Sequence, residues 1–290
     1  MKIIVLGISG MLGSTAFREL CKVSNMDVYG TARKSETSSF FDDDLRNRIT
    51  TGIDVEDFNS VVDLFTQIKP EVVVNCVGVV KQLASAKDPL TTVPINTILP
   101  HRLARLGSQI GARLIHVSTD CVFSGKKGNY KESDFPDADD LYGRSKLLGE
   151  VDYRNAITLR TSIVGRELDS RHGLIEWFLH EKGCVRGYRR AIFSGLITQE
   201  LTRVMVEHVL PRPELHGVYH VSSAPINKYD LLQLVKSTYG LDTEIQPDDS
   251  VVIDRSLNSE RLRTATGYRA PDWPTMITTM RAYDTTHKAR

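Results

Sequence analysis

The chain has 290 residues, of which 41% are hydrophobic and 25% are charged, as is usual for a soluble globular protein. This composition excludes a disordered tail protein, a collagen-like fibre and a disulfide scaffold. Lys+Arg 37 against Asp+Glu 36 leaves a formal net charge of +1. The chain therefore has no general attraction for nucleic acid or for an anionic membrane surface.

The cysteines and the apolar runs indicate the compartment. No CxxC pair and no histidine cluster at metal spacing occurs, which predicts reduced thiols and no metal site. No apolar run is long enough to span a membrane, and the run at the N-terminus is too short for a signal sequence. We therefore expect a cytoplasmic protein. The four thiols belong to Cys21, Cys76, Cys121 and Cys184.

Short apolar runs alternate with amphipathic segments up to about residue 165. The runs are rich in β-branched residues and predict buried parallel strands, whereas the apolar spacing between them predicts helices. This alternation predicts an α/β fold with a Rossmann-type, doubly wound parallel sheet. The predicted strands are 2–6, 27–31, 71–77, 113–118 and 157–161, and the predicted helices are 13–22, 55–69 and 100–111.

The alternation breaks after Gly165, and no linker or internal repeat separates the two parts. We expect residues 1–165 to bind a dinucleotide and to carry the chemistry. Residues 166–290 are expected to form a smaller α/β domain that mainly binds the substrate and returns some segments to the sheet. Helical patterns cover 172–180, 199–209 and 227–239, and an extended segment covers 217–221.

Three glycines stand between the first predicted strand and the first predicted helix. A tight turn needs glycine, and a pyrophosphate approaches the backbone only where no Cβ intervenes. The start of a helix adds N–H groups and the positive end of its dipole. A merely tight turn is the alternative, but strand, turn and helix follow in the order that dinucleotide binding requires. The predicted pyrophosphate-binding residues are Gly7, Ser9, Gly10, Met11, Leu12 and Gly13.

Two cations, Arg33 and Lys34, follow the second strand. An acidic residue there would bind the ribose 2′-hydroxyl of NAD, whereas cations suit the 2′-phosphate of NADP. The pattern thus favours NADP(H) and allows NAD(H); a solvated surface pair is the alternative. Asp54 is expected to cap the third helix, to contact the adenine, or both, and Val55 beside it is expected to be a cofactor-binding residue.

Tyr142 and Lys146 are four residues apart, so a helix places them on one face. A free tyrosine has a pKa of about 10, and a nearby ammonium lowers that pKa. Lys146 can also hydrogen-bond the nicotinamide ribose. Thr119, at the end of the preceding strand, can hold a substrate carbonyl against Tyr142. Together these residues predict protonation of a carbonyl oxygen as hydride arrives at its carbon.

The glycine turn and the segments 118–123, 128–132 and 142–150 resemble the extended short-chain dehydrogenase/reductases, more narrowly the dTDP-4-dehydrorhamnose reductase branch. The resemblance implies a Rossmann domain, a small nucleotide-sugar domain and reduction of a 4-keto sugar by NADPH or NADH in surface-polysaccharide precursor synthesis. It also allows a homodimer. By match, Thr119, Tyr142 and Lys146 are the catalytic triad, and Cys76, Val77, Gly78, Asn96 and Ser118 lie at the cofactor.

Several positions depart from that branch. Cys121 stands where the family has tyrosine, Ile163 where it has an aromatic residue, and Arg255 precedes serine rather than proline. Another 4-keto-6-deoxy sugar, such as an N-acetylated UDP-linked one, is thus at least as good a candidate as the rhamnose precursor. Arg189 and Arg255 are candidates for the diphosphate; a solvated loop is the alternative for Arg189. The predicted substrate-binding residues are Lys81, Cys121, Val122, Phe123, Ile163, Arg189 and Arg255.

Two other functions fit the same sequence pattern. An epimerase or dehydratase would keep NAD tightly bound and recycle it, which Arg33 and Lys34 weakly oppose. A non-catalytic protein is the other alternative, because the regulatory subunit of methionine adenosyltransferase resembles the same branch.

Overall fold

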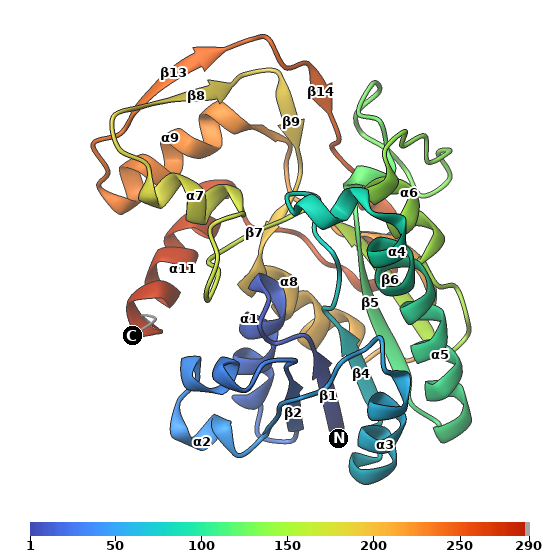
Figure 1. Ribbon diagram of the computed structural model, residues 1–290. Helices are drawn as coiled ribbons and strands as arrows, with labels where there is room; N and C mark the ends of the chain where they lie inside the picture. Colours follow the sequence, from blue (N-terminus) through green and yellow to red (C-terminus); the bar gives the residue numbers. More distant parts are fainter. Residues whose placement is uncertain (288–290) are drawn as a thin grey trace.

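The computed structural model describes residues 1–287 and is built around one seven-stranded sheet (Figure 1). All neighbouring strands in it are parallel. Their order, β11-β6-β5-β4-β1-β2-β3, contains the order 3-2-1-4-5-6 of a dinucleotide-binding sheet, so the predicted Rossmann-type fold is confirmed. The strands are β1 (Lys2–Leu6), β2 (Asp27–Thr31), β3 (Ile49–Thr50), β4 (Val72–Asn75), β5 (Arg113–Thr119), β6 (Ala156–Thr161) and β11 (Gly217–His220).

Apolar side chains pack on both faces of the sheet. On β1, Ile3 and Val5 belong to one core, whereas Ile4 and Leu6 belong to another. The first core includes residues of α1, α8, α9 and α11, and the second includes residues of α3 and α5. Because both faces are covered, the central strands β1 and β4 contain continuous apolar runs, residues 3–6 and 72–74. The helices are α1 (Met11–Cys21), α2 (Asp43–Arg46), α3 (Phe58–Ile68), α4 (Pro89–Thr92), α5 (Leu99–Ile110), α6 (Leu141–Leu148), α7 (Leu174–His180), α8 (Thr198–Val204), α9 (Lys228–Tyr239), α10 (Glu260–Thr266) and α11 (Trp273–Thr286).

The predicted elements are present with shifted ends. The helix predicted over 55–69 begins at Phe58, because the preceding segment forms a turn in which Asp54 Oδ1 accepts a hydrogen bond from Glu56 N at 3.0 Å. The second helix predicted after residue 165 is α8 followed by a π-helical segment, Met205–Val209.

The C-terminal part lies mainly beyond the carboxyl ends of the central strands (Figure 1). Within residues 1–287 its strands form three small sheets, in which β10 pairs with β7 at the end of the N-terminal part, β8 with β13, and β9 with β12 and β14. Several of its segments return to the N-terminal part: β11 pairs with β6, α8 packs on α1, and Leu257 forms a bridge with Tyr130. None of the helices within residues 1–287 is long and apolar enough to cross a membrane. The additional strands are β7 (Ile163–Val164), β8 (Cys184–Tyr188), β9 (Ala191–Phe193), β10 (Leu196–Ile197), β12 (Ile226–Asn227), β13 (Glu244–Asp248) and β14 (Ile253–Asp254).

Candidate active site

The carboxyl ends of β1, β2, β4 and β5 meet at one edge of the sheet. The glycine turn, the cations Arg33 and Lys34, and residues 76–78 follow the first three ends, and Thr119 is the last residue of β5. From β1 the chain continues to β2 on one side of the sheet, and from β4 it continues to β5 on the other side. The strand order therefore reverses between β1 and β4, and doubly wound sheets bind their ligands at such a point.

The turn between β1 and α1 leaves no room for side chains at two of its glycines. Gly7 has φ +83, and a Cβ there would lie 2.9 Å from Val77 Cγ2. A Cβ at Gly13 would overlap the Gly7 carbonyl oxygen, so α1 can start directly on the turn. Gly10 precedes the helix without a capping side chain, and the first N–H groups of the helix face the turn. The turn therefore fits a dinucleotide pyrophosphate, to which Met11 and Leu12 can offer backbone groups.

Arg33 and Lys34 follow β2 and line a pocket of about 240 Å³. Ser9 lines the same pocket, so the pocket joins the pyrophosphate turn to the two cations. Such a place suits the 2′-phosphate of a dinucleotide, because guanidinium and ammonium groups form short, charge-assisted hydrogen bonds with phosphate. The other lining residues are Glu36, Thr37, Phe40, Leu168, Asp169 and Ser170.

Asp54 and Val55 lie in the turn before α3. Asp57, not Asp54, precedes the helix, and no side chain caps it. Of the two roles expected for Asp54, capping is thus not observed, and contact with adenine stays a prediction. Val55 packs against the core shared by α3 and α5.

Asn96 braces the segment that follows β4. Its Oδ1 accepts a hydrogen bond from Val79 N at 2.9 Å, and its Nδ2 donates to Val79 O at 3.1 Å and to Ser145 Oγ at 3.3 Å. Asn96 is 1% exposed and lies in a π-helical segment, Val93–Ile98. It therefore ties helix α6 to the segment that contains the predicted cofactor residues Cys76, Val77 and Gly78.

The helix α6 carries Tyr142 and Lys146 close to Thr119, the last residue of β5. Asp140 precedes the helix and its Oδ1 accepts a hydrogen bond from Gly143 N at 2.7 Å. A Cβ at Gly143 would overlap the Cys121 carbonyl oxygen. Glycine at 143 thus lets the start of α6 approach the end of β5, and Thr119, Tyr142 and Lys146, together with Asn96, form what we call the catalytic edge.

Burial dominates the protonation of this edge. It raises the pKa of Tyr142, Cys121 raises it further, and an interaction with Thr119 partly opposes the rise. Burial also lowers the pKa of Lys146 from 10.5 to about 8. Lys146 Nζ donates to Val117 O at 2.7 Å. The expected lowering of the tyrosine pKa by Lys146 is therefore not observed: Lys146 is not among the groups that shift this pKa, and the opposing contact is Thr119. Tyr142 is thus a neutral phenol at pH 7.

Ser118 serves a buried polar network in this structure. Its Oγ donates to Glu150 Oε1 at 2.6 Å, and Glu150 forms an ion pair with Arg160 at 2.5 Å. The two charged side chains are 5% and 3% exposed. Arg160 in turn contacts His220 Nε2 at 2.8 Å, so the network joins β5 to β11, and contact of Ser118 with a cofactor stays a prediction.

Among the predicted substrate-binding residues, Cys121 lies within a cluster of charges. Burial raises the pKa of its thiol to about 12, Asp120 adds to the rise, and Arg255 and Lys81 oppose it. Lys228, the first residue of α9, lies near Cys121 and Asp120, and burial lowers the pKa of its ammonium. We call Lys81, Cys121, Lys228 and Arg255 the substrate side.

Two of these cations are held by direct contacts. Lys81 Nζ pairs with Asp140 Oδ2 at 2.5 Å, the same carboxylate that caps α6. Arg255 Nε donates to the Phe123 carbonyl oxygen at 2.8 Å. Both contacts anchor cations next to the segment that carries Cys121.

The other predicted substrate residues lie elsewhere. Val122 and Phe123 are fully buried, and the Phe123 ring stacks on Tyr130. Ile163 pairs with Leu196 and packs against the larger core. Arg189, between β8 and β9, forms an exposed ion pair with Asp249. Their contact with substrate stays a prediction.

Sequence reasoning missed Lys228 and Asp140. Lys228 follows the helix-capping Asn227, whose Oδ1 accepts from Asp230 N at 2.8 Å, and this signal identifies a helix start rather than a ligand site. Asp140 could have been predicted from the sequence as the residue that caps this helix, because a capping side chain accepts a hydrogen bond from the N–H group three residues later, here that of Gly143. Within residues 1–287 no group of three or more His, Cys, Asp or Glu side chains could hold a metal ion.

Comparison with protein families matches residues 1–182 to the RmlD substrate binding domain. The chain belongs to this family. SpsK, a spore coat polysaccharide biosynthesis protein of Bacillus subtilis, is 28% identical over 84% of this chain and 81% of that protein. Methionine adenosyltransferase 2 subunit beta of Danio rerio is 26% identical over 83% and 74%.

The fold is shared with solved reductase structures. A dTDP-4-dehydrorhamnose reductase from Bacillus anthracis, solved in complex with NADP, superposes with a TM-score of 0.80 at 20% identity. The match covers 97% of this chain and 99% of that one. The similarity includes the C-terminal part, where the sequence resemblance is thinnest.

Proposed function

We propose that the protein reduces a nucleotide-linked 4-keto-6-deoxy sugar with NADP(H), in the synthesis of a surface-polysaccharide precursor. One observation carries the proposal: Thr119 ends β5, Tyr142 and Lys146 of α6 lie beside it, and this strand end is at the same sheet edge as the glycine turn and the pocket of Arg33 and Lys34. The names of two relatives support it, since SpsK acts in spore coat polysaccharide biosynthesis and the Bacillus anthracis protein is a dTDP-4-dehydrorhamnose reductase with NADP.

The chemistry follows from the protonation of the catalytic edge. A nicotinamide cofactor held by the glycine turn would supply the hydride for C4 of the sugar. Tyr142 holds its proton at pH 7 because burial raises its pKa, and it gives that proton to the carbonyl oxygen as negative charge develops there. The Thr119 hydroxyl positions the same oxygen. The ammonium of Lys146 stabilises the tyrosinate that remains.

We assign residues 1–165 to cofactor binding and catalysis and residues 166–290 mainly to the nucleotide sugar. The cations of the substrate side support this division, because Lys228 and Arg255 come from the C-terminal part and lie near Cys121. The four free cysteines and the cofactor support a cytoplasmic enzyme.

The direct test is a spectrophotometric assay of cofactor oxidation with a panel of dTDP- and UDP-linked 4-keto-6-deoxy sugars. We expect NADPH to be oxidised with one member of the panel. Stoichiometric NAD in the purified protein without net oxidation would indicate an epimerase or dehydratase. The relative named as a methionine adenosyltransferase subunit favours a binding protein as second candidate. Copurification of a stoichiometric partner, with no oxidation of either cofactor, would support that candidate.

The cofactor preference is tested by the double variant Arg33→Ala/Lys34→Ala. Loss of two phosphate contacts is expected to lower the ratio of kcat/KM for NADPH to that for NADH by about 10- to 100-fold. Arg105→Ala, which removes an exposed cation from α5, should leave the ratio unchanged. An unchanged ratio in the double variant would show that the pair is solvated surface charge.

A further inference from the structure

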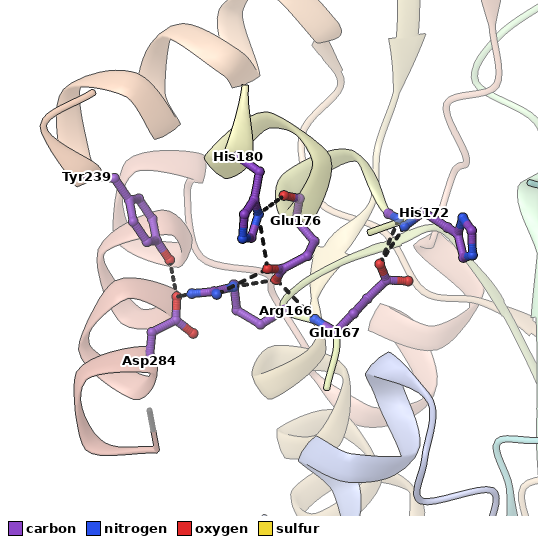
Figure 2. Close-up of polar contacts among 8 residues, drawn as sticks. Arg166, Glu167, His172, Glu176, His180, Tyr239 and Asp284 are labelled. Atoms are coloured by element: carbon purple, nitrogen blue, oxygen red, sulfur yellow. Dashed lines mark hydrogen bonds and ion pairs between the residues drawn. The ribbon is translucent and has the colours of Figure 1, made fainter. Parts of the chain in front are cut away.

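The segment between β7 and α7, which we call the 165–173 loop, is held by a cluster of charged side chains around Arg166 (Figure 2). Arg166 Nε donates to Glu176 Oε2 at 2.5 Å, and its Nη1 donates to Asp284 Oδ2 at 3.1 Å. The same Asp284 oxygen accepts a hydrogen bond from the Tyr239 hydroxyl at 2.5 Å. Glu176 and Asp284 are 5% and 11% exposed. Arg166 therefore joins the start of the loop to α7, α9 and α11.

Both ends of this loop pack against Met11, the first residue of α1. A Cβ at Gly165 would lie 3.3 Å from Met11 Cγ, and a Cβ at Gly173 would lie 2.6 Å from Met11 Cε. Glu167 Oε2 accepts hydrogen bonds from the backbone N–H groups of His172 at 2.7 Å and Gly173 at 3.0 Å, which closes the loop on itself. The loop is thus fixed against the pyrophosphate turn.

The tip of the loop, residues 168–170, lines the pocket that also contains Ser9, Arg33 and Lys34. We propose that the 165–173 loop is the second wall of the site for the adenosine 2′-phosphate, and that Arg166 is the positioning residue that holds this wall in place. The inference rests on the proposed use of NADP(H). Arg166 does not line the pocket, so it acts through the loop rather than by contact with the cofactor.

The physical reason is preorganisation. Asp169 and Ser170 are exposed, so the packing of their own side chains does little to order the tip of the loop. The ion pairs of Arg166 order the loop before a ligand binds, so binding does not have to supply the entropy cost of that ordering. Without these ion pairs, the pocket keeps its cations but has a mobile wall. The affinity for the adenosine end should then fall, while the catalytic edge is untouched.

The test compares Arg166→Gln with Arg203→Gln, which the chain offers as a matched control. Both arginine side chains are 38% exposed, and each pairs with two carboxylates. Arg203, however, lies on α8 and pairs with Glu200 and Glu207, neither of which belongs to the 165–173 loop. The probes are 2′,5′-ADP and 5′-AMP, titrated by calorimetry into the full-length chain, so that the contribution of the 2′-phosphate is measured by difference.

We expect Arg166→Gln to weaken 2′,5′-ADP binding by about tenfold, and more than it weakens 5′-AMP binding. Arg203→Gln should leave both affinities near those of the wild type, although both variants lower the melting temperature. The KM for NADPH should rise in Arg166→Gln far more than kcat changes, and Arg166→Lys should recover part of the affinity. If Arg166→Gln does not fold, Asp284→Asn, which keeps the Arg166–Glu176 pair, should give a smaller loss in the same direction.

Two outcomes overturn the inference in distinguishable ways. If the wild type binds 2′,5′-ADP and the Arg166 and Asp284 variants bind it equally well, the loop is not a wall of the site and the proposed cofactor stands. If the wild type binds neither 2′,5′-ADP nor NADPH, the proposed cofactor fails and the inference fails with it.

Discussion

The catalytic edge and the substrate side lie next to each other but are assembled from different parts of the chain. Tyr142 and Lys146 share one helix, and Gly143 lets that helix approach the strand end that carries Thr119. The cations of the substrate side instead come from the segment after β4, from the start of α9 and from the residue after β14. Apart from Asn96, the first arrangement lies within about 30 residues of sequence, from Thr119 to Lys146, whereas the second depends on how distant segments pack.

The largest expected effect tests the catalytic edge. Tyr142→Phe removes the proton donor but keeps the ring, so kcat should fall by about 10²- to 10⁴-fold, the usual contribution of general acid catalysis. The Kd for NADPH should change little. Tyr153→Phe is the control, because its hydroxyl also has a hydrogen-bond partner, His101 at 3.0 Å, but away from the edge. Retained turnover in Tyr142→Phe would contradict the proposed mechanism.

A smaller effect on kcat/KM is expected when Lys146 loses its proton at alkaline pH. Burial lowers its pKa to about 8 in the folded protein, so the ammonium is present below that pH and is lost as the pH rises through it. If the ammonium is required, kcat/KM, which reports the free enzyme, should fall by about tenfold per pH unit above this value. The measurement is kcat/KM between pH 6 and 10.

Lys146→Arg separates Lys146 from other groups that titrate in this range. An arginine stays charged throughout, so the alkaline fall should disappear from whatever activity this variant keeps. A fall at the same pH in Lys146→Arg would assign it to another group.

The same contrast explains what could be predicted from the sequence. The strands, the glycine turn and the Tyr142–Lys146 pair are local patterns, and the structure places these elements as expected. The raised pKa of Tyr142 was not predictable, because it results from burial by tertiary packing. Phe123 and Ile163 pack in apolar cores, and no local pattern distinguishes a core side chain from one that borders a ligand. Lys228 carries only the signal of a helix start.

The smallest expected effect is a change in the KM for the nucleotide sugar when a cation of the substrate side is removed. The same measurement shows whether the charged group of the substrate lies near Lys228 or near Arg189. Lys228→Met removes a cation near Cys121 and Asp120 and should raise the KM for the nucleotide sugar by about tenfold, the value of one charge-assisted hydrogen bond. Arg189→Ala is the matched comparison, because the sequence predicted Arg189 for the same role. Arg189 forms an exposed ion pair with Asp249, and such pairs contribute little, so its KM should stay close to that of the wild type. Arg189→Ala could instead raise KM as much as Lys228→Met does. The charged group of the substrate would then reach the connection between β8 and β9, and Arg189 would belong to the substrate side.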